Sequence, residues 1–102
     1  MDALVPADQI DAVARRFRLL GEPVRLRLLN VLAEEGEITV GDLVEATGQR
    51  QANVSKHLGL MADEDLLTRR REGVYVYYSI DDPTLSALCL LVSTQLQEAD
   101  AS

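Results

Sequence analysis

The chain has 102 residues, a length that suits one domain, and its hydrophobic share of 47% is ordinary for a globular protein. Acidic residues number 17 against 10 Lys and Arg, and the net charge of −7 argues against a general nucleic-acid coat. The single cysteine excludes an intrachain disulfide framework, and the sequence shows neither a signal peptide nor a membrane-spanning apolar run. We therefore expect a cytoplasmic protein with no membrane partner.

Two helices are predicted at the start of the chain, and each begins with a proline. Residues 6–20 carry apolar side chains at intervals of three and four, which indicates a helix with one buried face. Gly21 ends this helix, and Pro23 suits the first turn of a second helix over residues 23–33. Residues 34–37 are predicted to form a turn.

A helix-turn-helix pattern follows. Thr39 is expected to cap a short third helix, and Gly48 allows a sharp turn after it. The next helix covers residues 48–58, and no acid occurs between residues 46 and 62 of this otherwise acidic chain. A short helix, a glycine turn and a second helix with a polar outer side are typical of DNA-binding proteins.

The polar side of residues 48–58 is predicted to enter the DNA major groove. Gln and Asn side chains can pair with adenine there, and Lys can reach guanine. The opposite side is expected to be buried through Val54, Leu58 and Met61. The residues expected to contact bases or the nearby backbone are Gln51, Asn53, Ser55 and Lys56. The alternative is an ordinary amphipathic helix with one solvated side.

A β-hairpin is predicted next, with strands at residues 66–70 and 74–80 and a turn at residues 71–73. The core side of the second strand is expected to carry Val74, Val76, Tyr78 and Ile80. A hairpin in this place makes the motif a winged helix. The residues expected to contact phosphate are Arg50, Arg69, Arg70 and Arg71, with Tyr75 as a weaker candidate. The alternative for the wing arginines is a charged edge strand that resists aggregation.

A last helix is predicted over residues 83–99, with Asp82 as its cap and Pro83 in its first turn. Its apolar stripe continues almost to the end of the chain, and such a helix needs a partner. We expect it to pair with the helix at residues 6–20 and with its own copy in a second subunit, so that these helices form a homodimer interface. The alternative is packing on a larger core within one chain.

The predicted fold is mainly α with a small β-hairpin: a winged helix-turn-helix of five helices plus a wing, as one domain over residues 1–102. From about residue 17 to 83 the sequence resembles the ArsR/SmtB family of bacterial repressors. The stretches that carry this resemblance are residues 20–29, 37–43, 51–58, 70–73 and 76–80, the third being Gln51-Ala52-Asn53-Val54-Ser55-Lys56-His57-Leu58.

The resemblance implies dimerisation through the first and last helices, groove recognition by residues 51–57, and repression released by an effector. It also implies roles for two residues that the helical pattern alone does not assign. His57 is expected to close its helix against neighbouring groups or a phosphate, and Arg25 to anchor the fold or a phosphate.

Several departures from the family pattern limit the choice of effector. Metal sensors of the family often carry two cysteines within the stretch that corresponds to residues 37–43, and this chain has none there. The terminal helix has no His, so no metal site and no cofactor are expected. Cys89 is predicted to be a buried structural thiol, with an oxidisable thiol as the alternative. Asp65 stands where relatives usually place Gly, and Asp tolerates the left-handed conformation.

The predicted function is a homodimeric transcriptional repressor that binds an inverted-repeat operator in double-stranded DNA. One alternative is a winged-helix module for protein–protein contact without DNA binding, and another is a thiol-responsive repressor that uses Cys89. An enzyme is not expected, since one His, one Cys and no Gly-rich phosphate loop leave no catalytic residues to assign. A small-molecule or redox effector is compatible with the sequence but not identified by it.

Overall fold

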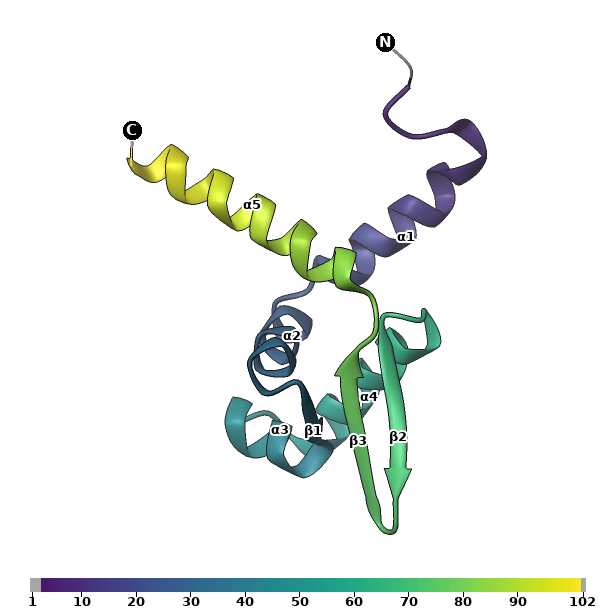
Figure 1. Ribbon diagram of the computed structural model, residues 1–102, viewed down its shortest axis with the longest axis vertical. Coiled ribbons are helices and arrows are strands. Elements are labelled where there is room, and N and C mark those ends of the chain that lie inside the picture. Colours follow the sequence, from purple (N-terminus) through teal and green to yellow (C-terminus); the bar gives the residue numbers. More distant parts are fainter. Residues whose placement is uncertain (1–2, 102) are drawn as a thin grey trace.

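The computed structural model describes residues 3–101 and confirms the predicted fold class, a mainly α winged helix-turn-helix (Figure 1). The expected domain also includes residues 1, 2 and 102, which lie outside the described part. In chain order the elements are η1 (Ala7–Gln9), α1 (Ile10–Leu20), α2 (Pro23–Glu35), β1 (Glu37–Thr39), α3 (Val40–Thr47), α4 (Gln51–Asp63), β2 (Leu67–Glu72), β3 (Tyr75–Ile80) and α5 (Pro83–Ala101).

The first two helices lie close to their predicted bounds. A single 3₁₀ turn precedes α1, and Gly21 ends it by donating its N–H to the carbonyl of Phe17 at 2.9 Å. The Glu22 side chain caps α2 by accepting the N–H of Arg25 at 3.1 Å. This helix runs two residues further than predicted, to Glu35, and Gly36 then takes a φ of +81° that favours glycine.

A third strand, β1, was not predicted, and it begins at Glu37, the last residue of the predicted turn. It pairs antiparallel with β3, so the sheet has the order β1-β3-β2 (Figure 1). Ile38 faces Tyr78 across this pair, and both are buried. The prediction was wrong at Glu37 because a strand of three residues is too short to show alternation, while its pairing partner lies some forty residues later in the chain.

The hydrophobic core lies where α2, α3, α4 and the sheet meet, and the end of α1 and the start of α5 close it. Its side chains come from every helix except η1. Those fully buried are Leu28, Leu32, Leu43, Val54, Leu58, Met61 and Leu66. Asp65 precedes Leu66 with a φ of +63°, which confirms that Asp adopts the left-handed conformation here.

The wing turns one residue later than predicted, at Gly73 and Val74, with a φ of +61° at Gly73. Arg71 therefore lies within β2, paired with Val76. The prediction of Val74 as a core residue was wrong: Val74 lies in the turn at the tip of the hairpin, where its side chain is 90% exposed. Tyr78, in contrast, is buried as predicted.

The terminal helices meet next to α2, near the middle of the molecule, and diverge toward the end opposite the wing tip (Figure 1). Asp82 caps α5 as predicted, accepting hydrogen bonds from the N–H and hydroxyl of Thr84 at 2.9 and 2.7 Å. Arg16 of α1 forms an ion pair with Asp82 at 3.2 Å, which holds the two helices together where they meet. All described side chains from Leu91 onward are exposed. Within residues 3–101, none of the helices has the length and hydropathy needed to cross a bilayer.

Candidate DNA-binding surface

α3 begins at a side-chain cap and ends at a glycine that turns the chain toward α4. The Thr39 hydroxyl accepts the N–H of Asp42 at 3.1 Å, as predicted for the start of α3. Gly48 ends α3 with a φ of +70° and donates its N–H to the carbonyl of Val44 at 2.9 Å. The helix predicted from residue 48 begins only at Gln51, because the chain stays extended at Arg50.

One side of α4 is fixed in the core. Val54, Leu58 and Met61 are fully buried, as predicted. His57 is also buried, with 7% exposure, and its Nδ1 accepts a hydrogen bond from Arg25 Nε at 3.1 Å. Arg25 Nη1 also donates to the carbonyl of Leu19 at 3.0 Å, so Arg25 anchors α1, α2 and α4 to one another. Burial, and next to it the charge of Arg25, lowers the pKa of His57.

The other side of α4 forms an exposed polar ridge, made of Arg50, Gln51, Ala52, Ser55 and Lys56. Asn53 is half-buried, and its amide donates to Gln49 Oε1 at 3.2 Å. A hollow of about 630 Å³ on one flank of the ridge is lined by Gly48, Gln49, Arg50, Ala52, Asn53 and Lys56. A hollow of about 430 Å³ on the other flank lies between Gln51 and Ser55 of α4 and Val76 and Tyr78 of the wing.

The wing arginines alternate between the two faces of the sheet. Arg69 lies opposite the buried Tyr78, and Arg71 lies opposite Val76, so both share the sheet face that borders α4. The guanidinium of Arg69 lies 5.5 Å from the ring centre of Tyr78. Arg70 lies opposite Tyr77 on the outer face. Tyr75 is exposed near the tip.

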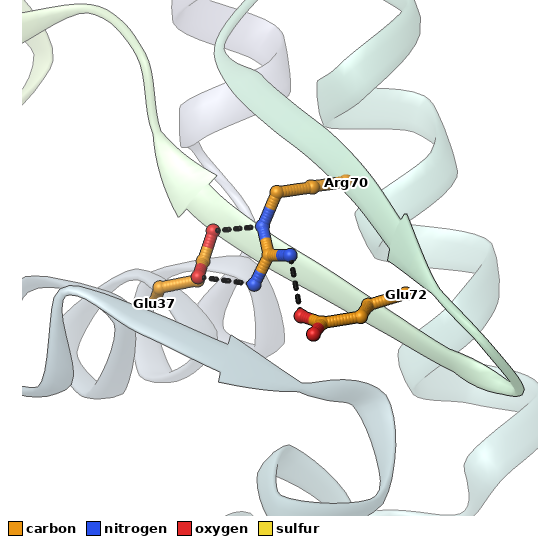
Figure 2. A network of polar contacts seen from close by, with 3 residues as sticks. All are labelled: Glu37, Arg70 and Glu72. Carbon is orange, nitrogen blue, oxygen red and sulfur yellow. Dashed lines mark hydrogen bonds and ion pairs between the residues drawn. The ribbon is translucent and has the colours of Figure 1, made fainter.

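Arg70 is held by two carboxylates, in a group that we call the Arg70 clamp: Glu37, Arg70 and Glu72 (Figure 2). Arg70 Nε and Nη2 donate to the two oxygens of Glu37 at 3.1 and 2.8 Å. Arg70 Nη1 donates to Glu72 Oε2 at 2.7 Å. These hydrogen bonds lower the pKa of Glu37 and raise that of Arg70. Glu37 was not predicted as a site residue. The only sign in the sequence of a strand at this place was its apolar neighbour, Ile38.

Cys89 is half-buried, whereas the sequence predicted a buried thiol. It lines an open hollow between α1, α2 and α5 that we call the α5 hollow. The volume of the hollow is about 540 Å³, and its apolar lining includes Phe17, Leu20, Leu26, Leu88, Val92 and Leu96. Over the described residues, no three His, Cys, Asp or Glu side chains come together in a way that could hold a metal ion.

The fold and this surface define a winged-helix DNA-binding protein. A family model described as the MarR family matches residues 22–74, from the cap of α2 to the turn of the wing. A probable mercury resistance operon repressor of Streptomyces lividans is 39% identical over 87% of this chain and 70% of its own length.

Two solved structures resemble the whole chain, including the terminal helices that the family model leaves out. The antimony-specific repressor AntR superposes with a TM-score of 0.86 and 32% identity, over 99% of this chain and 91% of its own. A homodimeric winged helix-turn-helix domain of Mycobacterium bovis, described as a possible ArsR-family regulator, gives a TM-score of 0.80 at 32% identity, covering 96% and 90%. This chain belongs to the ArsR/SmtB family of DNA-binding transcriptional repressors, and is not an enzyme.

Proposed function

We propose that this repressor acts as a homodimer that places two copies of α4 in successive major grooves of an inverted-repeat operator. The observation that carries the proposal is the separation of two surfaces. The wing tip lies at one end of the molecule, and the diverging terminal helices lie at the other (Figure 1). Two subunits joined through the terminal helices would leave both copies of α4 and of the wing free for DNA.

The polar ridge of α4 supplies the base contacts in this proposal. Gln51, Ser55 and Lys56 are exposed on one side of the helix, and no acid lies among the ridge residues. Asn53 lies at the edge of the ridge, where it would follow Gln51 into the groove. Arg50, at the start of α4, would contact phosphate. We place His57 with the residues that support α4, because its ring is buried and bound to Arg25.

The wing supplies further backbone contacts. Arg69 and Arg71 project from the sheet face that borders α4, so a phosphate backbone beside the ridge would meet them. Tyr75 lines the hollow between α4 and the wing and has a hydroxyl that can donate to phosphate. Arg69 and Arg71 concentrate positive charge on one surface of a chain whose net charge is −7.

The terminal helices supply the dimer interface. The α5 hollow has a largely apolar lining, and Phe17 and Leu96 on its walls are 54% and 58% exposed in one subunit. Large apolar surfaces of this kind mark sites of protein contact. The M. bovis relative with the same fold is described as homodimeric. A second copy of this chain, packed through α1 and α5, would cover the hollow.

The experiment that tests DNA docking compares two exposed cations at opposite ends of the molecule. Lys56→Ala should weaken binding to promoter DNA and make it less dependent on salt concentration, because it removes a cation from the ridge that faces the duplex. Arg15→Ala on α1 removes the same charge and should leave both quantities unchanged. Equal effects of the two changes would contradict docking through α4.

A further inference from the structure

The wing is joined to the helix-turn-helix through a short stretch of sheet. β1 is three residues long and leads directly into α3, the first helix of the motif. Its pairing with β3 covers only Glu37 to Thr39, opposite Ser79 to Tyr77. β2 pairs with β3 alone. The hairpin beyond Tyr77 therefore has no backbone bond to β1, and three residue pairs make up the whole backbone link between the wing and β1.

Arg70 adds a side-chain link to this short pairing, from the row in which Arg70, Tyr77 and Thr39 lie side by side. Its side chain leaves β2, crosses β3 and reaches Glu37 at the start of β1 (Figure 2). The two parallel hydrogen bonds to Glu37 fix the direction of the guanidinium as well as its position. The guanidinium also lies 4.5 Å from the ring centre of Tyr77 on the middle strand. One side chain thus contacts all three strands.

The charge of the clamp does not suit phosphate. One guanidinium between two carboxylates leaves a negative group on the outer face of the sheet. An approaching phosphate would have to displace a bidentate carboxylate and would be repelled by both acids. Arg69 and Arg71 lie on the opposite face, beside α4, and the described residues give neither of them an ion-pair partner.

We infer that Arg70 is a positioning residue, which together with Glu37 holds the wing at a fixed angle to the helix-turn-helix. Arg69 and Arg71 are left to contact the DNA backbone. α4 and the wing of each subunit then contact the duplex together. Binding does not have to fix the angle of the wing, so its conformational entropy cost is lower. This role rests on the proposed docking through α4 and the wing, and it removes Arg70 from the phosphate contacts predicted from the sequence.

The test uses a matched pair of charge-neutralising variants. Glu37→Gln and Glu72→Gln each remove one negative charge beside Arg70, but only the first reduces a bidentate ion pair between strands to a single amide acceptor. Binding of the full chain to a duplex selected from a random pool is followed by fluorescence anisotropy across a range of KCl concentrations. Arg70→Ala, Arg71→Ala and the double variant Glu37→Gln/Arg70→Ala complete the set, and thermal unfolding confirms that each variant folds.

Positioning predicts that Glu37→Gln weakens binding by about twofold to fivefold, the range for exposed ion pairs, although it removes a charge that repels DNA. Arg70→Ala should weaken it similarly with an unchanged salt slope, and the double variant should be no weaker than Arg70→Ala. Glu72→Gln should not weaken binding. Arg71→Ala should lower the salt slope by about 0.9.

Three results would overturn the inference. If Glu37→Gln and Glu72→Gln both tighten binding, the acids only mask an arginine that contacts phosphate. A drop of about 0.9 in the salt slope of Arg70→Ala would show the same. If Glu37→Gln leaves the affinity unchanged, the clamp has no part in DNA binding. A failure of the docking proposal itself would look different, because Lys56→Ala and Arg71→Ala would then leave the affinity unchanged.

Discussion

The two ends of the molecule use their side chains in opposite ways. In the part that carries α4 and the sheet, Arg25, His57 and Arg70 are tied by hydrogen bonds that fix these elements. At the other end, α5 presents Val92 and Leu96, which line the α5 hollow, to solvent at 51% and 58% exposure. The first arrangement makes a rigid surface ready for a ligand of fixed shape. The second is incomplete in one subunit, and it indicates where a second copy packs.

The largest effect is expected from a charge placed in the α5 hollow. Burial of one leucine contributes about 2 kcal/mol, and a two-fold interface loses this contribution twice in Leu96→Asp. The dimer dissociation constant should therefore rise by more than about a hundredfold. Sedimentation equilibrium should show a mass near twice 11.2 kDa for the wild type and near 11.2 kDa for the variant.

Thr94→Asp is the matched control for this change, because Thr94 is exposed on the side of α5 away from the hollow. It should leave the dimer intact. A wild-type protein that stays monomeric at high concentration would contradict the proposal that α1 and α5 form a dimer interface.

The next effect concerns the hydrogen bonds that hold α4. Arg25→Ala should lower the free energy of unfolding by about 1–3 kcal/mol, because it leaves His57 Nδ1 and the Leu19 carbonyl without their donor. Urea denaturation measures this loss. Arg27→Ala, an exposed change on the same helix, should cost far less. Equal losses would show that the Arg25 contacts add nothing to stability.

A smaller loss is expected at the start of α3. Thr39→Ala removes the hydroxyl that accepts the N–H of Asp42 and should cost about 1 kcal/mol of unfolding free energy. Thr39→Ser keeps the hydroxyl and should retain most of the stability. A serine variant as unstable as the alanine variant would assign the effect to the lost methyl group instead of the cap.

The smallest effect is a pH dependence from His57, the only histidine of the chain. Its pKa is lowered in the folded state, so the unfolded chain binds more protons once the pH falls below the ordinary histidine value of about 6.5. Stability should be full above that pH and decline from there down to the lowered pKa. His57→Gln keeps an acceptor for Arg25 but has no titrating ring. The thermal midpoint of this variant should therefore change less between pH 7 and 5.5 than that of the wild type. If stability declines equally with falling pH in the wild type and in His57→Gln, the pH dependence does not come from His57.

The helices and the wing were predictable because their signals are local. Gly48, Asp65 and Thr39 each serve the backbone role that their chemistry favours. The stripe of α4 separates its buried side from its polar side without knowledge of any partner. The leucines of α5 were equally visible as an apolar stripe at helical spacing.

What the sequence could not predict depends on contacts between distant residues. β1 forms only because β3 lies beside it, and Glu37 acquires its role only through Arg70. Three consecutive arginines look alike in the sequence, yet the register of the sheet places Arg70 on one face and its two neighbours on the other. The burial of His57 likewise depends on Arg25, from another helix.

The most direct test of the account is selection of bound duplexes from a random pool by the wild type and by Gln51→Ala. The wild type should select an inverted repeat whose half-sites lie about one helical turn apart, and Gln51→Ala should lose base preference at equivalent positions of both half-sites. A single unrepeated motif, or a preference that Gln51→Ala leaves unchanged, would contradict a dimer that recognises DNA through α4.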